Sequence, residues 1–119
     1  MPPSIVVQKA EDRRIQTFIS LDILNEIHRV LQYEKIQRIL KRSGREPSSI
    51  MATVVRLCSL IEVKSVVRAV KDPADNQVLA CAKDASADFI ISGDRHLLNL
   101  EQYESIIILT PSSFLETHR

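Results

Sequence analysis

Three acidic residues stand at or shortly after the predicted ends of strands. Asp94 comes just after an apolar run, and Asp75 and Glu26 lie in helices that follow two other apolar runs. Because functional groups gather beyond the carboxyl ends of parallel strands, we expect these side chains to share one edge of a sheet. Carboxylates that gather repel one another and favour a hard divalent cation such as Mg²⁺ or Mn²⁺. A metal held in this way activates water for phosphodiester hydrolysis.

Each of these acids also has a purely structural interpretation. Asp94 fits the cap of a short helix, and Asp75 fits a capping box behind an N-cap at Asp72. Glu26 falls near the edge of the apolar stripe of its helix, where the alternative is a solvated flank. Their common position at one sheet edge, rather than any single residue, supports the metal-site interpretation.

The elements that position these residues alternate along the chain. Apolar and β-branched runs predict strands at 15–19, 60–63, 88–92 and 106–109. Helical periodicity and capping residues predict helices at 5–14, 21–31, 33–41, 47–58, 72–85, 96–100 and from 110 onward. Strands separated by helices indicate a parallel α/β sheet with helices on both faces, in a single domain over residues 1–119.

The composition is that of an ordinary globular protein, with 119 residues, 45% apolar residues, 26% charged residues and a net charge of +1. It excludes a disordered chain and a disulfide scaffold, and the presence of only two glycines excludes dinucleotide and P-loop fingerprints. Cys58 and Cys81 show no metal or redox spacing, so we expect reduced, buried thiols. The sequence shows no apolar run of membrane-spanning length and no signal-peptide pattern, which indicates a cytoplasmic protein.

The small net charge conceals a division along the chain. Residues 1–71 carry 13 Lys and Arg against 7 Asp and Glu, whereas residues 72–119 carry 3 against 8. We interpret this as a basic surface and an acidic site in different parts of the fold. Basic side chains cluster in the helical segment after Glu26, at Arg29, Lys35, Arg38, Lys41, Arg42 and Arg45. They predict a rim that follows RNA phosphates beside the acidic site, and the alternative is a solvated helix face.

Four segments resemble the PIN domain, most closely its branch of toxin components in prokaryotic toxin–antitoxin systems. They are DPADNQVL at 72–79, ADFIISGDRHLL at 87–98, ILTPSSFL at 108–115, and the strand and helix of 18–31. The resemblance implies a three-layer α/β/α fold with a mostly parallel sheet. It also implies a Mg²⁺- or Mn²⁺-dependent endoribonuclease that cleaves single-stranded RNA and that an antitoxin protein holds in check.

The same resemblance assigns roles to individual residues. It places the catalytic, metal-binding acids at Glu26, Asp75 and Asp94 and the substrate contacts at Ser92, Arg95 and His96. Ser92 stands at the family's hydroxyl position. His96 replaces a second acid that often follows the family's Gly-Asp pair, and an imidazole there can bind metal or phosphate.

One part of the family pattern is missing. The family begins with a central strand that ends in a metal-binding aspartate, and MPP here resembles the stretch after that strand, so we expect an N-terminally truncated PIN-like sheet. Asp12, on the first helix, is a poor substitute for that aspartate. Three alternatives remain for the place of the missing strand. The sheet closes without the strand, Ser4–Val7 fills part of the gap, or a second chain pairs there, as in a homodimer. Without the aspartate, the alternative to an enzyme is a non-catalytic module that binds RNA or a protein.

Overall fold

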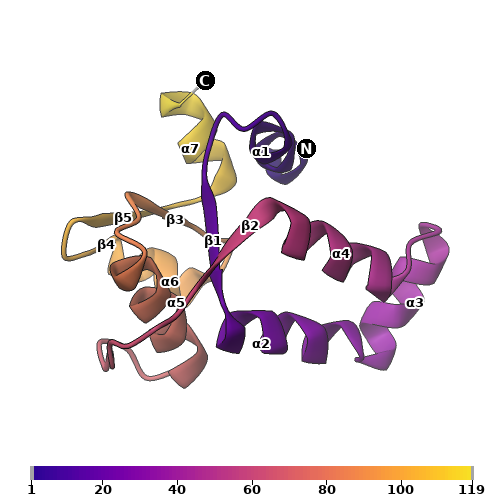
Figure 1. Ribbon diagram of the computed structural model, residues 1–119, viewed down its shortest axis with the longest axis horizontal. Coiled ribbons are helices and arrows are strands. Elements are labelled where there is room, and N and C mark those ends of the chain that lie inside the picture. Colours follow the sequence, from indigo (N-terminus) through magenta and orange to yellow (C-terminus); the bar gives the residue numbers. More distant parts are fainter. Residues whose placement is uncertain (1, 119) are drawn as a thin grey trace.

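The computed structural model describes residues 2–118, along which helices and strands alternate (Figure 1). The helices are α1 (Pro2–Glu11), α2 (Leu21–Leu31), α3 (Glu34–Arg42), α4 (Pro47–Leu57), α5 (Pro73–Asp84), α6 (Arg95–Leu100) and α7 (Pro111–Thr117). The strands are β1 (Thr17–Ser20), β2 (Cys58–Ile61), β3 (Phe89–Ile91), β4 (Gln102–Tyr103) and β5 (Ile106–Leu109). This order confirms the predicted α/β class.

Side-chain caps start three helices at the residues where the sequence predicts them. Ser20 Oγ accepts the backbone N–H of Ile23 at 3.1 Å and starts α2. Asp72 Oδ1 accepts the N–H of Ala74 at 2.9 Å and starts α5, and Thr110 caps α7 in the same way. Each cap satisfies an amide that the first turn of a helix leaves without a partner. These caps therefore set the residues at which α2, α5 and α7 begin.

The second strand lies earlier than predicted. β2 spans Cys58–Ile61, whereas the sequence predicts a strand at 60–63. The backbone N–H groups of Lys64 and Ser65 donate to Asp84 Oδ2 at 2.6 and 2.8 Å. A side chain on α5 therefore takes the hydrogen bonds that a longer strand would give to a neighbouring strand.

The strands form two separate sheets. β1 and β2 pair in parallel, from Thr17 opposite Cys58 to Ser20 opposite Ile61. β3 pairs in parallel with one side of β5, and β4 pairs antiparallel with its other side. Within residues 2–118, no strand joins β1 to β3, so the alternative in which the sheet closes without the family's first strand is not the one observed.

The alternative in which Ser4–Val7 fills part of this gap is not observed either. These residues belong to α1, because prolines fit the first turn of a helix, where no backbone N–H is needed, and the helix then packs against α7. Pairing with a second chain at the gap stays a prediction. The two-residue strand β4 was not predicted, since it is too short to show periodicity.

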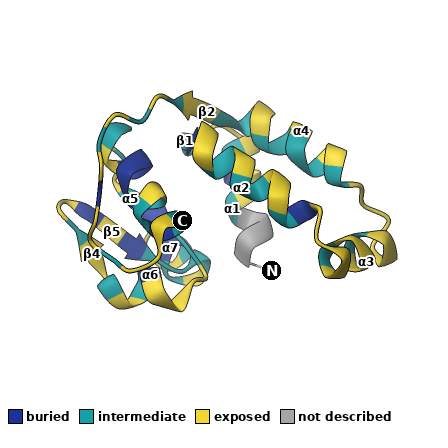
Figure 2. Cartoon of the chain, turned by 90° about the horizontal axis from the view of Figure 1, so that it is seen from below, coloured by how far each residue is buried: buried dark blue, intermediate teal, exposed yellow. Residues whose placement is uncertain are grey.

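The core lies between α5 and the three-stranded sheet, where the buried positions concentrate (Figure 2). Leu79, on α5, has no exposed surface. The aliphatic side chains of this core are Val67, Leu79, Ala80, Ala82, Ile90, Leu97, Ile106 and Ile108. Because α5 packs against β1 as well as against the three-stranded sheet, it links the two sheets.

The remaining helices extend the molecule to 40 Å along its longest axis. In both views α3 lies at one end, while α5 and α6 lie with the three-stranded sheet at the other (Figures 1 and 2). Helices α2 and α4 pack against each other and lead toward α3. No helix within residues 2–118 is both long and apolar enough to cross a membrane.

Candidate functional site

The fold brings two of the predicted acids together. Asp75 lies in the first turn of α5 and is 7% exposed. Asp94 follows β3 and stands at the start of α6. The charge of Asp94 and a hydrogen bond with its side chain both raise the pKa of Asp75, so the two carboxyl groups lie close together. The packing of α5 on the three-stranded sheet therefore creates a pair of acids from residues 19 positions apart.

The surroundings of this pair make two negative charges costly. Burial is the main reason why the pKa of Asp75 lies above its usual value, and the charges of Asp94 and Asp72 raise this pKa further. The charge of His96 acts in the opposite direction. A proton or a cation relieves such an arrangement. Carboxylate oxygens suit Mg²⁺, which is commonly bound by one or two carboxylates together with waters and substrate phosphates, so the pair fits a hard divalent cation.

Asp94 is anchored on two sides. Its Oδ1 accepts the backbone N–H of His96 at 2.8 Å, and its own N–H donates to Ser92 Oγ at 2.9 Å. The interpretation of Asp94 as a helix cap is thus correct. An ionised carboxylate offers about four lone-pair positions, so capping α6 leaves capacity for a cation. Arg95 and His96 are exposed in the first turn of α6, next to the pair.

Asp75 does not complete the capping box that its spacing suggested. Among the described hydrogen bonds, the cap of α5 consists of Asp72 and the N–H of Ala74, and Asp75 donates or accepts none with the backbone of Asp72. Its carboxyl group interacts with Asp94 instead. Burial without a capping role is unusual for an aspartate and supports a role in chemistry.

Glu26 does not join the acid pair. Arg29 Nη2 lies 2.5 Å from Glu26 Oε1, and Arg29 Nε donates to Glu26 Oε2 at 3.2 Å. Arg29 also donates to Tyr33 Oη at 2.7 Å. Within the described residues, no three or more His, Cys, Asp or Glu side chains lie close enough together to share a metal ion. The three expected carboxylates therefore do not form one cluster in this structure, and Glu26 pairs with Arg29 on the next turn of α2.

Sequence reasoning missed a residue that supports the pair. Asn76 Oδ1 accepts the N–H groups of Ala69 and Val70 at 3.1 and 3.0 Å, and its Nδ2 donates to Val70 O at 2.8 Å. These three bonds hold the loop that leads into α5 against its first turn, where Asp75 lies. The available signal was a polar amide directly after Asp75 on a helix that otherwise packs into the core.

The expected position of the basic rim is wrong. Most of its side chains lie on α3 or just after it, at the far end of the molecule from α5 and α6 (Figures 1 and 2). Arg29, which is the residue of the expected rim that lies on α2, forms an ion pair with Glu26. The physical reason is that α2 leads away from the sheet, so the residues that follow Glu26 in sequence lie progressively farther from the acid pair. The side chains on α3 fit the alternative of a solvated helix face.

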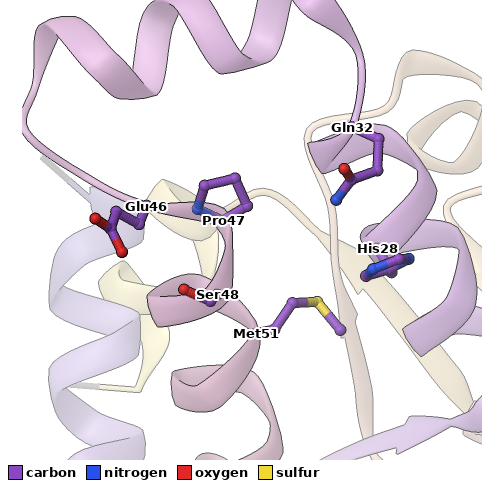
Figure 3. A pocket seen from close by; sticks show the side chains of 6 residues that line it. All are labelled: His28, Gln32, Glu46, Pro47, Ser48 and Met51. Atoms are coloured by element: carbon purple, nitrogen blue, oxygen red, sulfur yellow. The ribbon is translucent and has the colours of Figure 1, made fainter.

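A hollow of about 370 Å³ lies between α2 and α4 (Figure 3). Its lining residues are His28, Gln32, Glu46, Pro47, Ser48 and Met51. It includes neither Asp75 nor Asp94, and Glu46 is its single carboxylate. This hollow is separate from the acid pair and offers no paired carboxylates of its own.

A comparison with known protein families finds a match over most of the chain. The family model of the PIN domain matches residues 2–96, a span that runs from α1 through the start of α6 and includes Asp75 and Asp94. No curated protein matches the chain, and no solved structure matches it.

Proposed function

Because this chain belongs to the PIN domain family, whose members are generally metal-dependent nucleases, we propose that it is a Mg²⁺- or Mn²⁺-dependent endoribonuclease that cleaves single-stranded RNA. The observation that carries the proposal is the pairing of Asp75 with Asp94 beyond the end of β3. One of the two is buried, which makes a cation more favourable there than at a fully solvated pair.

Asp75 and Asp94 are the residues that would hold the cation. When bound, the cation supplies a water of lowered pKa and polarises the scissile phosphoryl group. The hydrogen bonds of Asp94 with Ser92 and with the N–H of His96 hold its carboxyl group in place before substrate arrives. Arg95, which is exposed beside it, would contact an RNA phosphate.

We keep Glu26 as a proposed third carboxylate. Its pair with Arg29 is open to solvent, with the two side chains 39% and 61% exposed. Exposed ion pairs contribute only about 0–1 kcal/mol, so a nearby cation can compete with Arg29 for Glu26. Because α2 packs against α5, Glu26 and Asp75 lie on neighbouring helices.

We also propose a toxin-type role in the cytoplasm, in which an antitoxin protein restrains the nuclease. The support is the resemblance of segments 72–79 and 87–98 to the toxin branch, together with the family match. A second copy of the chain is a further proposed partner, since β1 and β3 each have an edge without a partner strand within the described residues. Sedimentation of the purified protein tests whether it forms a homodimer.

A non-catalytic module that binds RNA or a protein is the second candidate function. The observation that favours it is the ion pair of Glu26 with Arg29, which leaves two carboxylates together rather than three. A module of this kind needs no metal, so it would bind RNA equally well with and without Mn²⁺.

The deciding experiment measures cleavage of single-stranded RNA with Mn²⁺ by the wild type and by Asp94→Asn. Asparagine caps a helix as well as aspartate, so the variant keeps α6 and removes only the charge. We expect cleavage to fall at least about 100-fold, given that even residues that support metal ligands cost 10–100-fold. Asp88→Asn, at an exposed aspartate just before β3, is the matched control and is expected to retain activity.

A metal-binding readout accompanies this assay. With Mn²⁺ at about 100 times its Kd, the wild type gains about 2.7 kcal/mol of stability, and the same gain is absent in Asp94→Asn. Equal traces of cleavage in both proteins would identify a contaminant and, with no shift of Tm by Mn²⁺, would leave the RNA- or protein-binding module.

A further inference from the structure

A groove separate from the acid pair lies where the end of α1, the start of β1 and the junction of α4 with β2 meet. Its volume is about 780 Å³. Three arginines line it, Arg13 and Arg14 from the turn after α1 and Arg56 from the end of α4, together with the single acid Glu11. The lining is therefore positively charged, and the expected basic rim on α2 and α3 contributes no residue to it.

The turn that ends α1 is built in an unusual way. Arg13 N–H donates to Ala10 O at 3.1 Å, and Arg14 N–H donates to Lys9 O at 2.9 Å. These two bonds form the Schellman motif, whose left-handed position usually holds glycine. Arg13 occupies that position with a φ of 58°. A side chain there strains the backbone, so the chain keeps an arginine in the groove at a cost in stability that glycine would avoid.

The charges in the groove are available to a ligand. Arg56 Nη2 lies 3.4 Å from Glu11 Oε1, and the two side chains are 62% and 46% exposed. A long, solvated pair of this kind contributes little, so an anion can displace Glu11. Within the described residues, Arg13 and Arg14 form no ion pair.

The other lining groups indicate what kind of anion fits. Gln16, Thr17 and Ser59 add polar side chains, and no aromatic side chain lines the groove. Bases are usually held by stacking on aromatic rings, whereas phosphates are held by guanidinium groups. We propose that this groove binds the phosphodiester backbone of single-stranded RNA without reading its base sequence. The proposal rests on RNA being the substrate, and it gives the substrate an anchor away from the acid pair.

The test measures binding of a fluorescent 12-nucleotide oligouridylate in EDTA, where no metal-dependent cleavage occurs. We expect Arg14→Gln and Arg56→Gln each to weaken binding about 3- to 10-fold at 0.1 M salt. For a single strand, each lost phosphate contact also lowers the slope of log K against log salt by about 0.7. Arg38→Gln, at an exposed arginine on α3, is the matched control and keeps wild-type affinity.

Two further variants separate binding from structure. Arg13→Gly relieves the left-handed strain, so we expect a higher Tm together with about 3- to 10-fold weaker RNA binding, which a purely structural role cannot produce. Glu11→Gln releases Arg56 and removes a negative charge, so we expect RNA binding to become about 2- to 5-fold tighter.

The proposal is wrong if Arg13→Gly and Arg14→Gln bind RNA within twofold of the wild type, or if Arg38→Gln loses as much affinity as they do. It is also wrong if the wild type binds a polyglutamate peptide and not RNA. Failure of the proposed RNA-binding groove can be told apart from failure of the proposed nuclease activity. Asp94→Asn is expected to lose cleavage while it keeps wild-type RNA affinity in EDTA.

Discussion

Replacing Asn76 with alanine tests how the loop before α5 is held. The wild-type side chain accepts two backbone N–H groups, from Ala69 and Val70, and donates to the carbonyl of Val70. Alanine removes all three hydrogen bonds and leaves the fold of α5 otherwise unchanged. The same loop carries Val67 into the core, so its release also loosens a buried side chain.

The expected cost follows from these contacts. Three hydrogen bonds at about 0.5–1.5 kcal/mol each amount to about 3 kcal/mol. Ala69 is exposed, so its N–H recovers part of this from water, and the better helix propensity of alanine returns about 0.5 kcal/mol. We therefore expect Asn76→Ala to lower the free energy of unfolding by about 2 kcal/mol. Asn76→Asp keeps an oxygen that accepts both N–H groups and loses the bond to Val70 O, so we expect a smaller loss than for Asn76→Ala.

Urea denaturation measures this difference. With a slope of about 1–3 kcal/mol/M for a small protein, the midpoint of Asn76→Ala should fall by about 1 M. Gln77→Ala changes an exposed neighbour on the same helix and is expected to stay within about 0.5 kcal/mol of the wild type. The reasoning is refuted if Asn76→Ala unfolds at the same urea concentration as Gln77→Ala.

Three other variants test the core, a cap and a charge. Leu79→Ala should lower the free energy of unfolding by about 2–5 kcal/mol in urea, because this side chain is fully buried. Ser20→Ala removes the cap of α2 and should cost about 1 kcal/mol in the same assay, with an unchanged midpoint contradicting the cap. Hydrogen bonds from Ser65 and Lys64 lower the pKa of Asp84 from 3.8. The stabilisation is therefore present above pH 3.8 and is lost as the pH falls through the lower folded value, so Tm should drop less steeply below about pH 4 in Asp84→Asn than in the wild type.

The helices were predictable where their start is decided locally. Ser20, Asp72 and Thr110 each place an oxygen against amides two or three residues ahead, and no distant contact is needed for that. The course of the chain after β2 was not predictable, because it involves Asp84, which lies about 20 residues further along the chain and accepts the N–H of Lys64. Non-local hydrogen bonds of this kind leave no periodic signal in the sequence.

The acid pair and Glu26 show the same contrast at the site. That Asp75 and Asp94 could meet follows from the predicted sheet edge, since Asp94 lies just beyond β3 and Asp75 lies in the first turn of a helix that packs on the same sheet. Whether Glu26 would lie with them depends on its alternatives, which are the guanidinium of Arg29 one turn away on α2 and the two acids on other elements. In this structure Glu26 pairs with Arg29, and spacing alone shows only that Arg29 and the other two acids are within reach in the sequence.

The division of the sheet has a consequence for how the molecule opens. No backbone ladder within residues 2–118 couples β1 and β2 to β3, β4 and β5, and the two groups are joined by side-chain packing, which includes α5 against β1 and α1 against α7. Local opening follows such boundaries, because a cooperative unit is defined by the contacts that must break together. The two groups should therefore exchange their amide hydrogens as two populations, with β1 and β2 opening while the hydrogen bonds between β3 and β5 stay closed.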